Sequence, residues 1–355
     1  MTETPKQLGF HLPAEWEEHS AVWLAWPHDI ISFGSLNEPE GKADKGRLER
    51  VEQKFVDVIK AIHESEPVDL LVTDDLMHQR TSTLMQKAGV DLNKITFHIT
   101  DYADVWMRDY GPLFINNPKT HEQAWIKWAY NAYGEKFKTL IKDNEVFFKL
   151  RGEIDKRMFE PGLILESGAI EGNGKGIILT TEECLLTRNP KLTKAAYEKY
   201  FAGFLGMSKT VWLKQGLTND HTDGHIDEIA RFASENTILF AYEDNKADPN
   251  FKILEDTYQT LKKATDHNGK PFNLINLPMP HKAYNDGGSI PASYCNFYIG
   301  NTAVLAAVFN DPNDARALEI IQSCFPDRKV IGIDCSDIIY GGGAIHCMTQ
   351  QQPTI

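Results

Sequence analysis

Three glycines and a cysteine stand together in the segment GGGAIHC, residues 341–347. Glycine lets a backbone approach a ligand closely and adopt conformations that other residues avoid, so the run predicts that Cys347 is held in a defined place. A thiolate is a strong nucleophile, and Cys347 is therefore the candidate for covalent catalysis, with Gly343 at the ligand. An inert buried thiol is the alternative. On a strand His346 would point away from Cys347, so we expect the proton partner to come from another segment.

A second polar segment, HTDGHIDE, spaces two histidines and two aspartates at every other position. On a strand His221, Asp223, His225 and Asp227 would face one side and could bind a divalent metal. Asp223 and the glycine after it are also typical of a turn before the strand, which would leave His225 and Asp227 as the aligned pair. Such a pair can move a proton and hold a cation. Both hypotheses stay open at this point.

Two more carboxylates lie in the segments WMRDYGP and LESGAI, and an asparagine lies in ASYCNFY. Asp109 is either a turn carboxylate paired with Arg108 or a buried acceptor beside Trp106, whose ring would form a wall for a cation. Glu166 is either a solvent-facing strand residue or, with LIL before it and SGAI after it, a carboxylate in an apolar neighbourhood. A guanidinium group is planar, always charged and carries five N–H donors, which two or three carboxylates can match. The electrophile would then be the guanidinium carbon, and the leaving group ammonia.

Composition narrows the class of protein. The 355 residues are 42% apolar and 25% charged, which is typical of a globular protein, and the formal net charge of −13 disfavours nucleic acid and anionic membranes as partners. The five cysteines form no CxxC pair, which indicates a reducing compartment. The segment MTETPKQLGFHLPAEW has neither the basic nor the apolar region of a signal peptide, so we expect a cytoplasmic protein.

The elements that must position these residues follow a repeated order. Helical spacing of apolar residues over 48–62, followed by VDLLVT, predicts a helix feeding a strand. The order hairpin, helix, strand then recurs three times, with hairpins over 163–183, 224–243 and 295–309. The helices begin near residues 192, 251 and 313, about sixty residues apart. With two units nearer the N-terminus, about five modules would close as a ring, so we predict one α/β domain over residues 1–355. The polar segments occur about once per module and would meet at one end of the ring.

Seven segments together resemble agmatine deiminases and the related bacterial, Porphyromonas-type, peptidylarginine deiminases of the pentein superfamily. They cover the chain from near Pro13 onward and are PAEWEEHSAVWLAWP, WMRDYGP, TTEECLLTRNP, GHIDEIARF, ASYCNFYIGN, FPDRKVIGID and GGGAIHCMTQQQP. The resemblance implies a pentein fold, which is a five-bladed α/β propeller of ββαβ-type modules with pseudo-fivefold symmetry. This expectation agrees with the number of modules inferred from the element order.

The resemblance also implies a role for each catalytic candidate. Cys347 would be the nucleophile and form a covalent amidino-thioether, with His225 as the general acid and base. Asp109 and Asp227 would hold the guanidinium group. Glu166 would support His225 and orient the nitrogens. The implied enzyme is a hydrolase of carbon–nitrogen bonds in linear amidines that needs no metal or organic cofactor.

Two pocket residues, Trp106 and Asn296, follow from the same resemblance, and the segment YNAYG favours one substrate. Related secreted peptidylarginine enzymes carry arginines there to meet a substrate carboxylate, whereas this chain has Asn131 and Tyr133. These uncharged residues favour agmatine, with N-carbamoylputrescine as the product for polyamine synthesis. The assembly that we predict for this chain is a homodimer.

Four positions depart from the usual agmatine deiminase pattern, in which glycine commonly stands at Ser167, asparagine at Glu228 and Ala344, and tryptophan at Tyr133. Three alternatives stay open. A peptidylarginine deiminase would convert arginine in a peptide to citrulline. A metal-dependent hydrolase would lose activity to chelators and tolerate Cys347→Ser. A non-catalytic guanidino-binding relative would lack a member of the Cys, His and carboxylate set, all of which are present.

Overall fold

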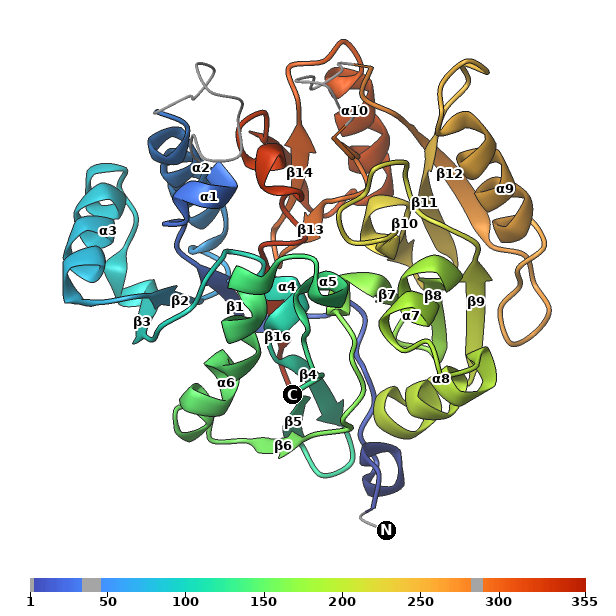
Figure 1. Ribbon diagram of the computed structural model, residues 1–355, viewed down its shortest axis with the longest axis horizontal. Coiled ribbons are helices and arrows are strands. Elements are labelled where there is room, and N and C mark those ends of the chain that lie inside the picture. The colour runs from blue at the N-terminus through green and yellow to red at the C-terminus, as the bar shows by residue number, and fades with distance from the viewer. Residues whose placement is uncertain (1–2, 34–45, 282–289) are drawn as a thin grey trace.

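The computed structural model describes residues 3–33, 46–281 and 290–355. Five small mixed sheets form its framework, which confirms the predicted α/β fold of five modules (Figure 1). Residues 1–2, 34–45 and 282–289 belong to the predicted domain of 1–355 but lie outside the described residues. That the whole range forms one domain stays a prediction.

Each sheet contains three strands, except the first, which contains four. In spatial order they are β16 (Gln350–Pro353), β1 (His19–Ala25), β2 (Val68–Val72) and β3 (Ile95–Ile99); β4 (Leu113–Asn117), β5 (Glu122–Ile126) and β6 (Arg157–Phe159); β7 (Ile170–Gly172), β8 (Ile177–Thr181) and β9 (Lys209–Leu213); β10 (Ala230–Ser234), β11 (Thr237–Tyr242) and β12 (Asn273–Pro278); β13 (Tyr298–Ile299), β14 (Ala303–Val308) and β15 (Lys329–Asp334).

All five sheets use the same connection. A first antiparallel pair is followed by a crossover to a parallel strand, as in β7, β8 and β9. Strands β10 to β12 and β13 to β15 repeat this order. In the first sheet the antiparallel partner of β1 is β16, so segments from both ends of the chain share one sheet. Residues 341–349, which precede β16, are thereby fixed against the opening strand.

The described residues contain ten α-helices, most of which lie in crossovers between parallel strands. They are α1 (Ile30–Phe33), α2 (Arg47–Ile62), α3 (Asp75–Lys87), α4 (Met107–Tyr110), α5 (Ala132–Glu135), α6 (Val146–Lys149), α7 (Glu182–Arg188), α8 (Lys194–Tyr200), α9 (Phe251–Leu261) and α10 (Asp314–Cys324). In α2 the apolar positions Val51, Phe55, Ile59 and Ile62 recur at helical spacing and are buried. Helix α7 is not among the predicted helices. Thr181 caps it by accepting a hydrogen bond from the Cys184 N–H.

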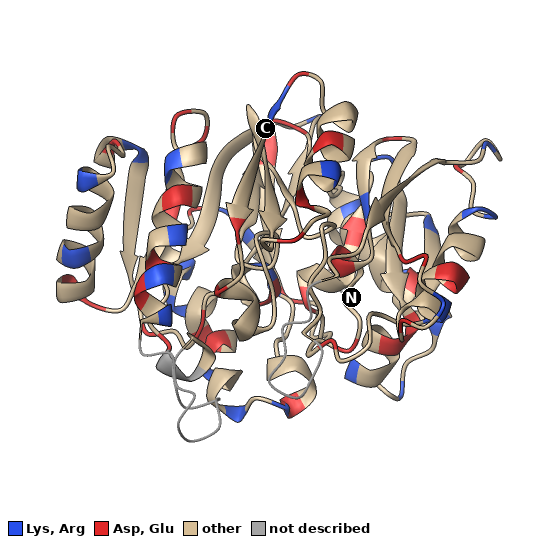
Figure 2. Cartoon of the chain, turned by 90° about the horizontal axis from the view of Figure 1, so that it is seen from above, with Lys and Arg blue, Asp and Glu red and all other residues tan. Residues whose placement is uncertain are grey.

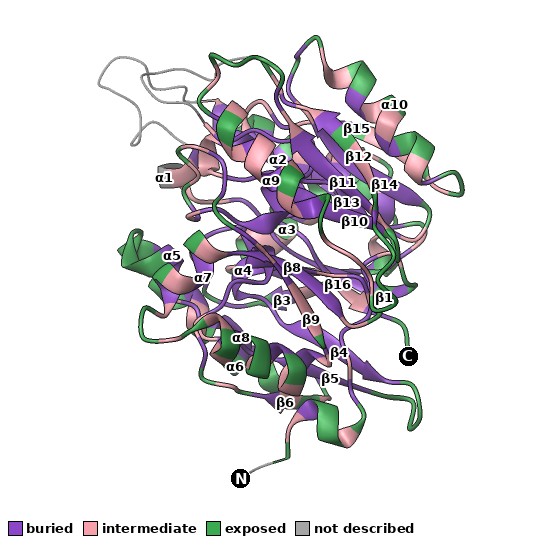
Figure 3. Cartoon of the chain, turned by 90° about the vertical axis from the view of Figure 1, so that its right-hand side faces the viewer, coloured by how far each residue is buried: buried purple, intermediate pink, exposed green. Residues whose placement is uncertain are grey.

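The longer helices lie around the outside, and the strands lie nearer the centre. The short helix α4 and strand β16 are found at the centre itself (Figure 1). The strands are mostly buried, whereas the helices show exposed faces (Figure 3). Lys, Arg, Asp and Glu alternate along those outer helices (Figure 2). In the three described ranges no helix combines the length and the apolarity that crossing a bilayer requires.

The polar segments lie just before strands, in turns or, for Met107–Tyr110, in helix α4, and this corrects the expectation that His225 and Asp227 align on a strand. His225 stands directly before the 3-10 segment Ile226–Glu228, and β10 begins only at residue 230. Glu166 precedes a similar 3-10 turn before β7. Cys347 lies in a turn that ends before β16. In a strand, the backbone groups of these residues would pair with a neighbouring strand. In a turn, successive side chains can point to the same centre.

Candidate active site

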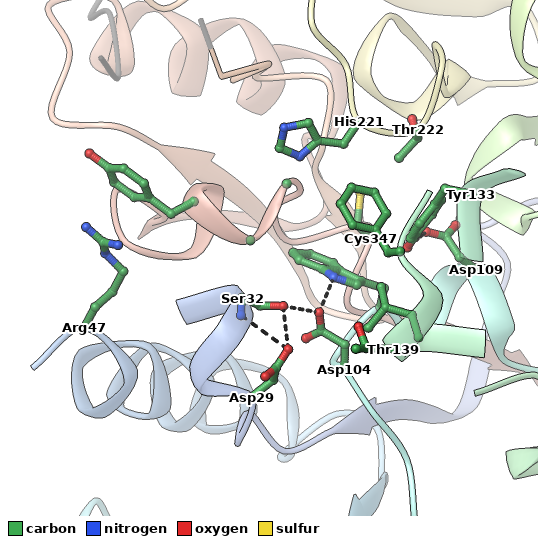
Figure 4. Close-up of a pocket in the computed structure, with 16 residues that line it drawn as sticks. Asp29, Ser32, Arg47, Asp104, Asp109, Tyr133, Thr139, His221, Thr222 and Cys347 are labelled. Carbon is green, nitrogen blue, oxygen red and sulfur yellow. Dashed lines mark hydrogen bonds between the residues drawn. The ribbon is translucent and has the colours of Figure 1, made fainter. Parts of the chain in front are cut away.

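A cavity of about 340 Å³ opens at the central end of the modules. Its wall includes Cys347, Asp109, Trp106, Tyr133 and Phe137. Figure 4 shows Cys347, Asp109 and Tyr133 close together on one side of this cavity. The volume suits a small ligand. Side chains that are distant in the sequence therefore converge at one cavity, as the ring of modules predicts.

The Cys347 sulfur is surrounded by an amide and two carboxyl groups. Its Sγ lies 3.1 Å from Asn296 Nδ2, 3.5 Å from Asp227 Oδ2 and 3.8 Å from Glu228 Oε1. Asn296 also accepts a hydrogen bond of 2.8 Å from the His346 N–H through Oδ1, which fixes the turn. Burial, followed by the charges of Asp227 and Glu228, raises the pKa of the Cys347 thiol well above its ordinary value. The resting group is therefore a thiol that a bound cation would help to ionise.

His225 lies buried between two carboxylates. Its Nδ1 is 3.7 Å from Asp109 Oδ1, and its Nε2 is 3.8 Å from Glu166 Oε2. Burial lowers the pKa of His225, but Asp109 and the neighbouring Cys184 and Glu166 outweigh that effect and hold the pKa well above its ordinary value. His225 is therefore protonated at rest and can act as an acid.

Asp109 is held by Tyr133 and by the backbone of a glycine. The Tyr133 hydroxyl donates to Oδ2 at 2.8 Å, and the Gly168 N–H donates to Oδ1 at 3.2 Å. A Cβ at Gly168 would lie 2.7 Å from His225 Nδ1 and 2.8 Å from Asp109 Oδ1, so only glycine permits this close approach. Burial raises the pKa of Asp109 to about 6, against the opposing effect of His225.

Glu166 is fixed by a buried arginine. The Arg188 Nε donates to Oε1 at 2.7 Å, and Arg188 Nη1 donates to Asp223 Oδ2 at 2.6 Å. Burial alone would raise the pKa of Glu166, but His225 and Arg188 lower it. Asp223 therefore anchors Arg188. His221 lies at the cavity wall, and the centroid of its ring is 6.1 Å from that of Phe137.

The structure does not bring the four residues of the metal hypothesis together. Among the described residues, three groups of possible ligand atoms lie within 4.8 Å of one another, and neither His221 nor Asp223 belongs to any of them. The groups are Glu166 with Cys184 and His225, Asp227 with Glu228 and Cys347, and Glu15 with Glu171 and His346. Asp223 is instead engaged by Arg188 and Lys136.

Five buried polar atoms around Cys347 and His225 have no hydrogen-bond partner in the described part of the chain. They are Glu166 Oε2, Asp227 Oδ1, Glu228 Oε2 and both ring nitrogens of His225. Buried polar atoms are almost always paired in folded proteins, so such a set indicates a missing polar ligand. Three of the five are carboxyl oxygens near a buried thiol, which fits a cation with several N–H donors.

The remaining predicted residues lie either at the cavity, as Trp106, Gly343 and Tyr133 do, or outside its wall, as Asn131 does. Trp106 lines the cavity and donates through Nε1 to Asp104 Oδ2 at 2.9 Å. Gly343 lies against the Trp106 ring and the Cys347 sulfur, and Tyr133 reaches Asp109. Asn131 is not part of the cavity wall, because its Oδ1 accepts from the Gly134 N–H at 2.8 Å and caps a turn.

Gly343→Ala is expected to lower kcat/KM by about 100-fold, because misplacing reacting groups by about 1 Å can cost that much. A Cβ at residue 343 would lie 2.7 Å from Trp106 Cζ3 and 3.1 Å from Cys347 Sγ. Steady-state kinetics and thermal unfolding would measure the effect. Gly152→Ala is the matched control, since nothing lies within 4 Å of a Cβ there. Equal activity of the two variants would contradict the placement of Gly343 at the ligand.

Comparisons with known proteins identify the family of this chain. A family model described as Porphyromonas-type peptidyl-arginine deiminase matches residues 11–353. An agmatine deiminase of Ectopseudomonas mendocina is 33% identical over 99% of this chain and 98% of its own length. The solved structure of an Enterococcus faecalis agmatine deiminase superimposes with a TM-score of 0.90 at 31% identity, covering 100% of this chain and 98% of that one. A C. jejuni agmatine deiminase with a cysteine replaced by serine and with substrate bound gives a TM-score of 0.84 at 28% identity, covering 97% and 96%.

Proposed function

This chain belongs to the Porphyromonas-type peptidyl-arginine deiminase family, and from that membership and the site geometry we propose its reaction. It is an agmatine deiminase, a hydrolase of a carbon–nitrogen bond in a linear amidine. Agmatine and water give N-carbamoylputrescine and ammonia. The single observation that carries the site assignment is the set of unpartnered buried atoms around the thiol. That the enzyme forms a homodimer stays a prediction.

Asp109 and Asp227 bind the guanidinium group across the thiol. Among the described residues Asp227 Oδ1 has no hydrogen-bond partner, and its Oδ2 lies 3.5 Å from Cys347 Sγ, so a nitrogen held by Asp227 brings its carbon next to the sulfur. Trp106 covers the opposite face as a cation–π wall. The positive charge of the substrate lowers the cost of forming the thiolate, so the Cys347 thiol releases its proton to solvent, while Asp227, whose Oδ2 is bound by His346, stays ionised.

The first half of the reaction releases ammonia. Cys347 Sγ forms a bond to the guanidinium carbon, and the tetrahedral adduct then breaks a carbon–nitrogen bond. Protonated His225 donates a proton to the leaving nitrogen, so ammonia departs rather than an amide anion. The product of this half is an amidino-thioether on Cys347, with His225 left neutral between Asp109 and Glu166.

The second half uses water. Neutral His225 accepts a proton from a water molecule, whose oxygen attacks the same carbon. Collapse of this adduct breaks the carbon–sulfur bond, and the proton of the added hydroxyl passes to the departing sulfur. Cys347 is thereby restored as the thiol, and the carbon keeps the oxygen as a ureido group. Glu166, tied to Arg188, stabilises the imidazolium that forms, as carboxylates do for catalytic histidines.

The far part of the cavity favours an ammonium tail over a carboxylate. Asp29 and Asp104 lie there with Ser32, set apart from Cys347 and Asp109 (Figure 4). Burial raises the pKa of Asp104 to about 7, and a nearby ammonium group would favour its charged form. Arg47 also reaches the wall, but its guanidinium stacks 3.8 Å from the Tyr340 ring centroid. These features support agmatine over peptidylarginine.

Ammonia release from agmatine, free arginine and a peptide ending in arginine tests the proposal, with EDTA present throughout. We expect turnover of agmatine alone, unaffected by the chelator. Preference for the peptide would move the assignment to protein citrullination. Loss of agmatine turnover on chelation, with recovery on adding a divalent metal, would instead support a metal-dependent hydrolase.

The kcat/KM for agmatine is expected to fall as the pH falls through about 6. The pKa of Asp109 is raised to about 6, so this carboxyl is ionised above that pH and becomes neutral below it. Neutral Asp109 holds a guanidinium group poorly, so the loss comes from substrate binding. A pH series of initial rates measures it, with enzyme returned from pH 5 to pH 8 as the control for unfolding. A flat profile between these values would contradict the assignment of Asp109.

A further inference from the structure

His346 bridges two buried carboxylates behind the catalytic cysteine. Its Nδ1 lies 2.7 Å from Asp227 Oδ2, and its Nε2 lies 2.8 Å from Glu15 Oε2. All three side chains are buried. His346 is not among the residues that line the cavity, and the reaction described above leaves it without a role.

Both contacts require His346 to donate. A carboxylate is only an acceptor, and a neutral imidazole has only one N–H. Two short bonds to two carboxylates are therefore satisfied together by the doubly protonated imidazolium. The sequence argument that a neighbour of Cys347 must point away from the site fails, because the turn directs the His346 side chain toward Asp227.

The surrounding groups balance that charge. Glu15 accepts from Arg231 Nη2 at 2.8 Å and lies 3.7 Å from Arg108 Nη2, and Arg231 Nε donates to Glu171 at 3.0 Å. Asp227, Glu15 and Glu171 supply three negative charges, and Arg108, Arg231 and an imidazolium at His346 supply three positive ones. A neutral His346 would leave one buried negative charge uncompensated, which is costly. Arg108 also donates through Nε to the His346 carbonyl at 3.3 Å.

We propose that His346 is a positioning residue, whose imidazolium keeps Asp227 ionised and aims its free Oδ1 at the guanidinium group. This inference rests on the proposed deiminase reaction and deepens it. One Asp227 oxygen is used by His346 while the other stays unpartnered, so the carboxylate cannot rotate without losing a short charged hydrogen bond. Burial would raise the pKa of Asp227, but the His346 hydrogen bond and charge lower it.

Two neutral substitutions separate the two bonds of His346. In His346→Asn the amide nitrogen can take the place of Nδ1 and still donate to Asp227. In His346→Gln it can take the place of Nε2 and donate to Glu15, leaving Asp227 unheld. Removing outer partners of reactive groups commonly costs about 10- to 100-fold, so we expect kcat/KM for agmatine to fall about 10-fold in the first variant and about 100-fold in the second.

The pH profile distinguishes positioning from a purely structural role. Without the imidazolium, the pKa of Asp227 rises toward that of Asp109. The acid limb of kcat/KM should therefore move to higher pH by up to about one unit and steepen, because two carboxyl groups rather than one now take up protons. KM should rise, since the guanidinium group is held less well.

His98 offers a matched control. It also bridges two carboxylates, with Nε2 2.8 Å from Asp69 and Nδ1 2.5 Å from Glu153, and it is 7% exposed at β3, apart from the cavity wall. His98→Asn should lower the melting temperature while kcat/KM and its pH profile stay within about twofold. Should the His346 variants fail to fold, Glu15→Gln removes one charge beside the imidazolium, and we expect the same upward shift of the acid limb at smaller size.

Two results would overturn the inference. One is an unchanged KM and acid limb in folded His346→Gln; the other is an unchanged acid limb in Glu15→Gln when only that variant folds. Failure of the proposed function is separate, because it would appear as absence of ammonia release from agmatine by the unsubstituted protein. An acid-limb shift in the variants with a normal profile in His98→Asn would support the inference.

Discussion

Cys347→Ala is expected to lower kcat for agmatine hydrolysis by at least about 10,000-fold, because removing the nucleophile of a covalent mechanism removes the whole route. The side chains that contact the Cys347 sulfur are weaker nucleophiles than a thiolate: Asn296 is an amide, and Asp227 and Glu228 are carboxyl groups. Ammonia release over hours at high enzyme concentration would measure the residual rate.

Binding should survive this substitution. Asp109 and Asp227 keep their contacts to Tyr133 and His346, so Cys347→Ala should still bind agmatine in calorimetry. Cys324→Ala is the control, because that half-buried thiol lies at the end of α10 and should leave kcat unchanged within about twofold. Residual turnover by Cys347→Ala within tenfold of the unsubstituted enzyme would show that another group attacks the substrate.

His225→Asn is expected to lower kcat by about 1,000-fold, within the range that loss of a general acid and base commonly costs. The departing nitrogen then has no proton donor, and the attacking water has no base. Both ring nitrogens of His225 lack partners and face Asp109 and Glu166, so the substitution leaves two buried carboxylates without their shared cation. Rapid-mixing kinetics with agmatine would report the loss in the ammonia-release step.

His63→Asn controls for the removal of a buried histidine. Its ring bonds to backbone carbonyls near the end of α2, so the variant should lose stability without a comparable loss of kcat. If His225→Asn kept kcat within tenfold of the unsubstituted enzyme, His225 would not be the proton donor for ammonia.

The module order could be predicted because apolar patterning is local. The run AVLAAV of β14 is buried along nearly its whole length, and α2 carries its apolar stripe at helical spacing. Recurrence of hairpin, helix and strand then implied a ring, and a ring implied that one polar segment per module meets the others. Cys347, His225, Asp109, Asp227 and Glu166 do meet, although their roles stay proposals.

What could not be predicted depends on contacts between modules. The strand interpretation of residues 221–228 made a metal site plausible, whereas Asp223 in fact anchors Arg188, a residue of α7 that showed no local signal of its role. Alternation along a strand would direct His346 away from Cys347, whereas the turn directs its ring toward Asp227. Glu228 departs from the family pattern, and its place 3.8 Å from Cys347 Sγ depends on a turn whose geometry is set by distant partners.

The most direct test of the account is to trap the covalent intermediate. The unsubstituted enzyme would be mixed with agmatine, quenched in acid during turnover and analysed by intact-protein and peptide mass spectrometry. We predict a mass increase equal to agmatine less ammonia, carried by the peptide that contains Cys347 and absent from Cys347→Ala. An adduct on another residue, or continued agmatine turnover by Cys347→Ala, would contradict the assignment of Cys347 as the nucleophile.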